Sequence, residues 1–216
     1  MTNIINFFKE GGLWMIPIAF ISFLSLGITA ERVIFIFFRY NINGAAFMAQ
    51  IQKLVMANNI DRAIKLCNAA PYAALARVIK AGLTRANKGE IEIQNAIEEA
   101  SLEVMPQLTK RSGTLATLAS LATLAGLLGT VFGLIGAFRA VSNAPAAEKA
   151  AILTGAIAEA MNCTAFGLLV GIPTLFAHLM LNGMQKKIID EIDFYSVKLE
   201  NLLITRGKGG LEGGEG

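Results

Sequence analysis

The residues most able to do chemistry in this chain lie inside two long apolar segments. The segment from Leu115 to Phe138 has no charged residue, and the segment from Ala150 to Asn182 has a single carboxylate, Glu159. Each is long enough for an α-helix that crosses a membrane, which needs about 20 apolar residues. A carboxylate at such a depth is costly unless it faces protein or water. This arrangement predicts an ion path.

Hydroxyl groups and glycines divide the first of these segments into two faces. At about 100° per residue, Ser120, Thr123 and Thr130 fall within one arc of a helix. We take Ser120 and Thr123 as candidates for lining a pore, although a helical hydroxyl can also bond the carbonyl one turn back. Small residues allow close approach of membrane helices. The glycines on the neighbouring arc are therefore predicted to serve helix packing: Gly126, Gly129, Gly133 and Gly136.

The second segment has one polar face that follows helical spacing. Its members are Thr164, Gly167, Gly171, Thr174 and His178. We expect Gly167 and Gly171 to pack against another helix, and Thr174 and His178 to be candidates for lining a pore. His178 is interpreted as a hydrogen-bonded side chain that ends this face. A proton relay is the alternative for His178, since histidine titrates near neutral pH.

The composition indicates a polytopic membrane protein. Of the 216 residues, 54% are hydrophobic and 16% are charged, whereas soluble domains have about 25% charged residues. Leu13 to Phe38 forms a third apolar segment, interpreted as an uncleaved transmembrane helix because the apolar run continues beyond Glu31 and Arg32. These two residues are expected to pair near the membrane surface.

Lysines and arginines predict the orientation of the chain in the membrane. Ten of them lie between residues 39 and 111, and five lie after residue 182, whereas few lie before Leu13 or between residues 139 and 149. The positive-inside rule then places the N-terminus outside and the C-terminus in the cytoplasm. The net charge of +3 reflects this topology, and no nucleic-acid partner is expected.

The predicted fold class is an all-α polytopic membrane protein. Its three transmembrane helices include two that extend into a cytoplasmic helical domain. Short amphipathic helices are expected from Gly44 to Ala86, with breaks at Asn58-Asn59 and Pro71, and one long helix is expected from Glu90 to Val141, kinked at Pro106. The expected order is an external segment 1–12, a transmembrane helix 13–38, a cytoplasmic region 39–111, a transmembrane helix 112–141, an external turn 142–149, a transmembrane helix 150–182, a cytoplasmic helix 183–206 and a disordered tail 207–216.

Other kinds of site are not expected. Cys67 and Cys163 fall in different compartments on this topology, so we expect neither a disulfide nor a zinc site. No nucleotide-binding loop or catalytic constellation is visible. The chain is therefore expected not to be an enzyme and to need no metal or cofactor.

Two stretches resemble a known family. GLLGTVFG around Thr130 and IAEAMNCTAFGLLVGIP around Glu159 and Thr164 are similar to the MotA/TolQ/ExbB proton-channel family, most of all to its three-span TolQ/ExbB branch. The resemblance implies a homopentamer around two copies of a single-span partner similar to ExbD or TolR. The partner's transmembrane Asp would carry the proton, Thr130 and Thr164 would face it, and Glu159 would be the glutamate on the pore side.

The resemblance also implies a function and leaves alternatives open. Proton flow would turn the pentamer about its partner and deliver work to the cell envelope, with a TonB-like or other envelope-spanning protein as a further partner. Two positions depart from the family pattern, namely Thr123, where proline is frequent, and Phe132, where tryptophan is frequent. A passive membrane scaffold and a small-solute permease subunit are the alternative functions. TonB-type uptake, Tol-type envelope maintenance and gliding motility all stay open as the driven process.

Overall fold

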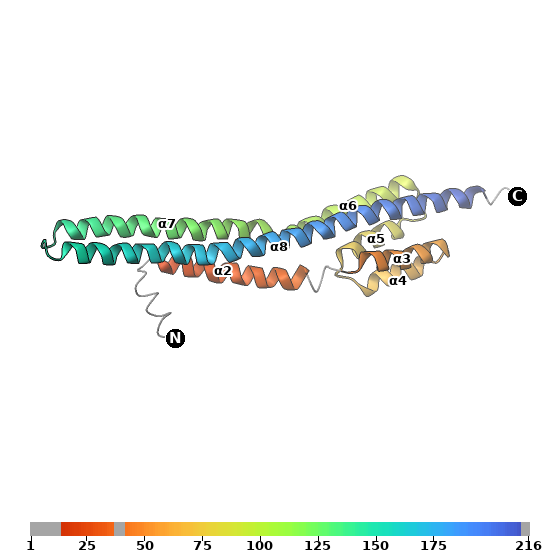
Figure 1. Cartoon of the computed structure of the whole chain (residues 1–216). Helices are drawn as coiled ribbons and strands as arrows, with labels where there is room; N and C mark the ends of the chain where they lie inside the picture. The colour runs from red at the N-terminus through yellow and green to blue at the C-terminus, as the bar shows by residue number, and fades with distance from the viewer. Residues whose placement is uncertain (1–13, 37–41, 213–216) are drawn as a thin grey trace. The chain divides into compact units, whose positions relative to one another are not determined.

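The part of the chain that the structure describes consists of helices joined by short turns. The structure is a computed structural model that describes residues 14–36 and 42–212, with side chains to residue 206, and this part contains no strand. The helices are α2 (Met15–Ile34), α3 (Gly44–Met56), α4 (Ile60–Ala69), α5 (Ala74–Thr84), α6 (Glu90–Thr109), α7 (Ser112–Ser142) and α8 (Lys149–Glu212) (Figure 1). The predicted all-α fold class is confirmed.

The helices form two compact units. The first unit contains Met1–Glu31 and Arg111–Met180, and the second contains Arg32–Lys110 and Leu181–Gly216. Three helical stretches are long and apolar enough to cross a membrane, namely Met15–Ile34, Glu90–Ser142 and Lys149–Arg206. The chain is therefore a membrane protein with three candidate spans, as predicted. The predicted segment 1–12 and part of the predicted helix 13–38 lie outside the described residues.

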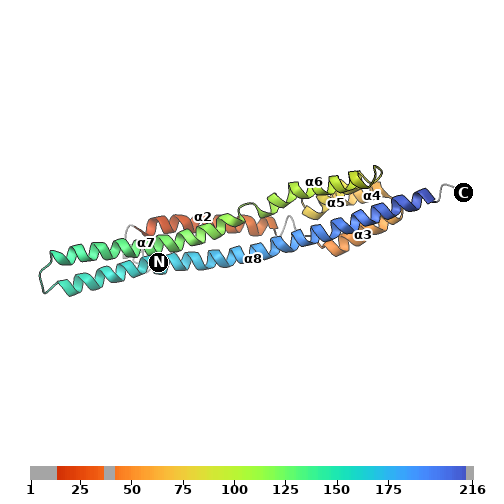
Figure 2. The same ribbon diagram turned by 90° about the horizontal axis from the view of Figure 1, so that it is seen from above.

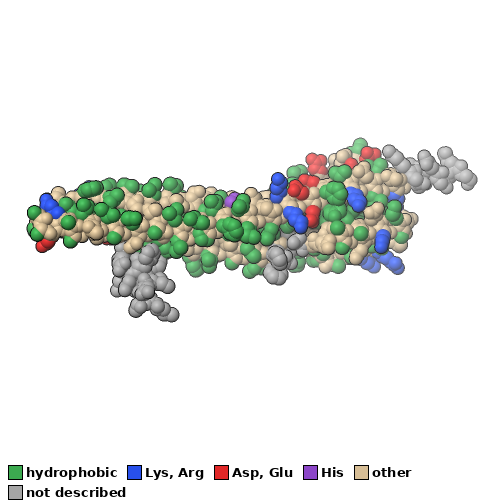
Figure 3. Space-filling view, in the orientation of Figure 1, with side chains coloured by type: hydrophobic (Ala, Val, Ile, Leu, Met, Phe, Trp, Pro, Cys, Tyr) green, Lys and Arg blue, Asp and Glu red, His purple; other side chains and the backbone are tan. Residues whose placement is uncertain are grey.

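In the first unit, α7 and the first half of α8 lie side by side and antiparallel, with α2 alongside them (Figures 1 and 2). Large apolar side chains point outward, as with Phe20 at 65% and Leu169 at 67% exposed. The buried contacts of the unit use mainly smaller residues, such as Ala122. This distribution suits a surface surrounded by lipid, where helices associate through close packing of small residues. In Figure 3 hydrophobic side chains are spread over the surface of this unit, whereas most of the charged side chains in view belong to the other unit.

In the second unit, three short amphipathic helices pack with α6 and the last part of α8. The helix breaks predicted at Asn58-Asn59 and Pro71 are confirmed, because α3 ends before the first and α4 ends before the second. Gly82 of α5 lies at the centre of the packing: a Cβ there would be 2.8 Å from Ile97 of α6 and 3.0 Å from Leu199 of α8. Burial within α4 raises the pKa of the Cys67 thiol to about 11, which suits a structural and unreactive cysteine.

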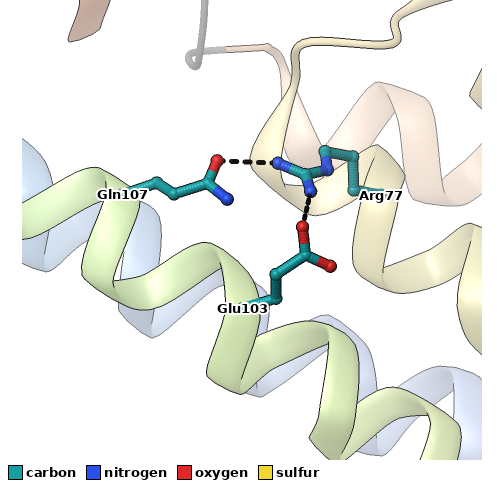
Figure 4. A network of polar contacts seen from close by, with 3 residues as sticks. All are labelled: Arg77, Glu103 and Gln107. Atoms are coloured by element: carbon teal, nitrogen blue, oxygen red, sulfur yellow. Dashed lines mark hydrogen bonds and ion pairs between the residues drawn. The ribbon is translucent and has the colours of Figure 1, made fainter.

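A polar network joins α5 to α6 within this unit. The Arg77 guanidinium donates one hydrogen bond to the Glu103 carboxylate and another, of 2.8 Å, to the side-chain oxygen of Gln107 (Figure 4). One turn of α6 separates Glu103 from Gln107, so a single planar guanidinium reaches two successive turns. Arg85 and Glu92 form a second ion pair between the ends of the same helices.

The expected continuous helix from Glu90 to Val141 is wrong in one respect. The helix is interrupted at Lys110 and Arg111, where Lys110 is extended and Arg111 is left-handed with a φ of 62°. Pro106 lies inside α6 and does not end it. A non-glycine residue in the left-handed region costs about 1–2 kcal/mol, and here Arg111 forms an ion pair with Glu31.

That ion pair also corrects the expected pairing of Glu31 with Arg32. Arg32 is 4% exposed, and its guanidinium donates a 3.4 Å hydrogen bond to the backbone oxygen of Gln107. This carbonyl lies in the last turn of α6, where backbone oxygens lack partners within the helix and a cation is favourable. Neighbouring residues of α2 therefore make different contacts.

The ends of α8 also differ from the expectation. The turn before it comprises residues 143–148 around Pro145, close to the predicted 142–149. At the other end α8 continues to Glu212 and so includes most of the tail 207–216 that was predicted to be disordered. Glycine lowers helix stability by about 1 kcal/mol per residue, but no proline interrupts the backbone there. Residues 213–216 lie outside the described part.

Candidate ion path along α7 and α8

Glycines bring the backbones of α7 and α8 into direct contact. A Cβ added to Gly126 would be 2.9 Å from the backbone oxygen of Cys163 and 3.1 Å from the Cα of Gly167. A Cβ added to Gly167 would be 2.7 Å from the backbone oxygen of Ala122. Because these neighbours are backbone atoms, no side-chain rotation would relieve the clash. Only glycine fits at these two positions with the helices this close.

The other predicted packing glycines have different surroundings. Gly133 faces Ala160, Gly129 faces Cys163 and Trp14, and Gly171 faces the hydroxyl of Thr123. Gly136 has open space where its Cβ would be. The structure therefore does not include Gly136 in the contact between these helices.

Helix α2, together with Trp14 directly before it, covers one side of the α7–α8 contact. Gly129 lies within close reach of both Cys163 and Trp14, and the Trp14 ring stacks on Phe132 with 4.9 Å between the ring centroids. About one turn further along α2, Ile18 packs with Ala122 and Val170. This side of the helix pair is therefore closed by the chain itself.

Thr130 and Thr164 lie on the other side of the α7–α8 contact. Thr130 comes directly after Gly129, and Thr164 comes directly after Cys163, which packs against Gly129 on the Trp14 side. One residue corresponds to about 100° around a helix, so both threonines point away from that side. Gly126 and Gly167, which form the contact itself, lie between these two directions. The two threonines are half-buried and occupy neighbouring levels, because Gly126 packs directly against Thr164 and lies one turn from Thr130.

Both threonine hydroxyls use their proton within the chain. Thr130 donates a 2.6 Å hydrogen bond to the backbone oxygen of Leu127, and Thr164 donates a 3.2 Å bond across the helix contact to the backbone oxygen of Gly126. A hydroxyl oxygen that donates in this way keeps acceptor lone pairs. Each can therefore accept a bond from a protonated acid without any rearrangement, whereas an ionised acid would require the hydroxyl to leave its carbonyl.

Among the predicted pore-lining residues, Ser120 and Thr123 share the side of Thr130 and Thr164, whereas Thr174 does not. Ser120 and Thr123 are exposed, and each donates to the carbonyl four residues back. Thr174 is 7% exposed and donates to Val170, and its hydroxyl lies 3.2 Å from that of Ser25 in α2. Thr174 is therefore buried against α2. The pairing residue Ser25 was not among the predicted site residues, although it is a hydroxyl within an apolar segment.

His178 and Glu159 lie at opposite ends of the polar face. His178 is half-buried, and its buried Nδ1 has no hydrogen-bond partner among the described residues. Glu159 is exposed, and no ion pair to it occurs in the part of the chain that the structure describes. It lies about 140° around the helix axis from Thr164, since five residues separate them. The structure thus brings Thr130 and Thr164 together and places Glu159 on another side.

The sequence around this site matches a known family. Residues 71–193, more than half of the chain, match the MotA/TolQ/ExbB proton channel family. The chain belongs to this family. The match includes α7, the turn and most of α8, so it contains Thr130, Glu159 and Thr164. The family predicted from the sequence is confirmed, and the assignment to the TolQ/ExbB branch stays a prediction.

Among solved structures, this MotA/TolQ/ExbB chain is similar to one described as the structure of C. jejuni MotAB. The sequence identity is 15% and the TM-score is 0.49, over 90% of this chain and 85% of the other. No curated protein matches the chain.

Proposed function

We propose that the chain is the proton-channel subunit of an inner-membrane motor driven by the proton-motive force. In this proposal five copies form a ring around a single-span partner similar to ExbD or TolR, with an Asp in its transmembrane helix. Proton movement through the ring delivers work to the cell envelope, with a TonB-like or other envelope-spanning protein as a further partner. The N-terminus lies outside and the C-terminus lies in the cytoplasm.

The arrangement of Thr130 and Thr164 carries this proposal. Two hydroxyl oxygens lie at neighbouring levels on the side not covered by α2, and either can accept the one hydrogen bond that a protonated carboxyl group donates. A neutral acid can therefore be held inside the membrane, where an isolated ionised one is costly. When the acid loses its proton, rotation of the hydroxyls lets them donate to the carboxylate. The same two residues thus serve both protonation states of a partner Asp.

The described residues place no carboxylate beside Thr130 or Thr164. Among the described residues from Ser112 to Asn182, Arg139, Glu148, Lys149 and Glu159 are the ones with a charged side chain, and none lies beside Thr130 or Thr164 along its helix. A proton path at this level therefore requires an acid from another protein. A two-protein channel is therefore favoured over a path built from one chain.

The assembly can be tested by purification in mild detergent followed by native mass spectrometry. We expect a ring of five copies together with a co-purifying protein that has one apolar span containing Asp. Proteoliposomes holding the complex should take up protons when a membrane potential is applied. A stable monomer without any such protein would contradict the proposal.

Glu159 provides a separate prediction. In the proposed complex it lies near the outer mouth, where it attracts cations, so Glu159→Gln should strongly reduce proton-driven activity by removing titration at nearly constant size. Glu159→Asp should have a milder effect. Native mass spectrometry should show an unchanged ring with bound partner in both variants.

The matched control for Glu159 is Glu148→Gln, which removes a carboxylate from the turn between α7 and α8. Its proton flux should equal that of the unmodified chain. If Glu159→Gln is fully active and Glu159→Ala disrupts the ring, Glu159 is a structural hydrogen-bonding residue.

A further inference from the structure

An open groove runs between α7 and α8 on the side away from α2. Its volume is about 340 Å³, and it is lined mainly by Ser120, Thr123 and Leu124 from α7 and by Gly171, Ile172 and Leu175 from α8. Gly171 lines the groove where α8 comes closest to α7. A Cβ there would lie 2.6 Å from the Thr123 hydroxyl oxygen and 3.0 Å from the backbone oxygen of Ala119.

The chemistry of the groove suits an apolar side chain. The hydroxyls of Ser120 and Thr123 donate to the backbone oxygens of Ala116 and Ala119, so neither donor is left unused. The walls consist of apolar side chains that are largely exposed: Leu124 is 58%, Ile172 is 64% and Leu175 is 53% exposed. An apolar group would therefore bury these walls without stranding a polar atom.

The groove continues the face that presents Thr130 and Thr164. On α7, Thr123 lies seven residues before Thr130, and on α8, Gly171 lies seven residues after Thr164. Seven residues make nearly two helical turns and a rise of about 10.5 Å, so each pair keeps nearly the same direction around its helix. The hydroxyl pair and the groove are thus successive levels of one surface.

We propose that this groove receives a large apolar side chain from the transmembrane helix of the single-span partner. The side chain belongs to the residue seven positions from the partner's Asp, on the side away from the α7–α8 turn. This inference rests on the proposed function. A partner helix whose axis lies alongside α8 has the same rise per residue. An Asp at Thr130 and Thr164 therefore brings that residue to the level of Gly171, where its side chain would fill the groove between Leu124 and Leu175.

Disulfide cross-linking in membranes tests the groove. The chain carries Leu124→Cys and is produced with the co-purifying single-span protein, in which the residue seven positions from Asp is changed to Cys. Mild oxidation should give a disulfide-linked heterodimer as the main product. Cys67 and Cys163 are buried and can be left unchanged.

Two matched controls test whether the cross-link depends on the position of the partner Cys and on the face of this chain that carries the other Cys. A partner Cys five positions from Asp lies about 160° around the helix from the seventh and should give no product above background. Phe20→Cys, on the exposed face of α2, should also give none with the partner Cys at the seventh position.

The outcomes separate this inference from the proposed function. A disulfide-linked homodimer of the Leu124→Cys chain in place of the heterodimer would show that the groove faces a second copy. Equal amounts of heterodimer from partner Cys residues at the fifth and seventh positions would show that the groove does not select the seventh side chain. Either result, or a bound partner without any cross-link, overturns the groove assignment and leaves the proposed function standing. The absence of any single-span protein would overturn both.

Discussion

Replacing both Thr130 and Thr164 with valine should abolish proton-driven activity while the chain stays folded and assembled. Valine keeps the branched shape of threonine and removes the hydroxyl, so a protonated acid inside the membrane loses its acceptor and an ionised acid loses both of its donors. A hydrogen bond to a charged group contributes about 1.5–3 kcal/mol, and every 1.4 kcal/mol corresponds to about tenfold in rate. Proton flux into proteoliposomes should therefore fall by at least roughly a hundredfold when both bonds are lost.

The structural cost of these changes is small. The Gly126 carbonyl that accepts from Thr164 lies within a helix and also has the backbone amide of Thr130 as its helical partner, so valine leaves no stranded acceptor. Hydrogen bonds between membrane helices average about 0.6 kcal/mol. Ring formation and partner binding should therefore persist in native mass spectra.

Two controls accompany the double valine variant. Thr154→Val removes another hydroxyl of α8, which donates a hydrogen bond to the backbone oxygen of Ala150 one turn back. This variant should leave proton flux unchanged. Serine at positions 130 and 164 should retain activity, because the hydroxyl remains. Normal flux in the double valine variant would reduce both threonines to packing residues.

Gly167→Ala should clearly destabilise the first unit. Its Cβ would lie 2.7 Å from the backbone oxygen of Ala122 and 3.0 Å from the Cα of Gly126, so the helices must separate. Overpacking costs about 1–3 kcal/mol, and separation would also lengthen the Thr164–Gly126 hydrogen bond. We expect the thermal unfolding midpoint in detergent to fall by about 4–8 °C.

Gly155→Ala is the matched control for Gly167→Ala. Gly155 lies in the same helix and has open space around its Cβ position, so alanine there should leave the midpoint unchanged or raise it slightly through better helix propensity. Equal midpoints for the two variants would contradict the close contact of α7 and α8.

Much of the fold could be predicted from the sequence because the apolar segments are long and clearly bounded. Segments such as Leu115–Phe138 have one favourable structure in a membrane, since a helix alone satisfies its own backbone there. The break at Lys110 and Arg111 could not be predicted in the same way. Neither residue is a glycine or proline, and the contacts of Arg111 with Glu31 and of Arg32 with Gln107 depend on residues distant in sequence.

The site was only partly predictable for a related reason. Helical periodicity places Gly167 and Gly171 on one face, because phase within one helix follows from spacing alone, and in the structure both lie against α7. Periodicity does not say which neighbour a face meets. Thr174 shares the polar face of α8 in sequence, yet its hydroxyl lies against Ser25 of α2. The position of α2 therefore decides which hydroxyls stay accessible, and no pattern within α8 contains that information.

The backbone contact between α7 and α8 limits how this protein can move. Where Gly126 and Gly167 meet, neither helix can slide or rotate about its own axis without bringing a neighbouring side chain against backbone. Well-packed interfaces of this kind favour discrete arrangements over continuous deformation. In the proposed function, this contact leaves two kinds of motion during ion transit: a hydroxyl such as that of Thr130 can rotate, and the α7–α8 pair can move as a single rigid body.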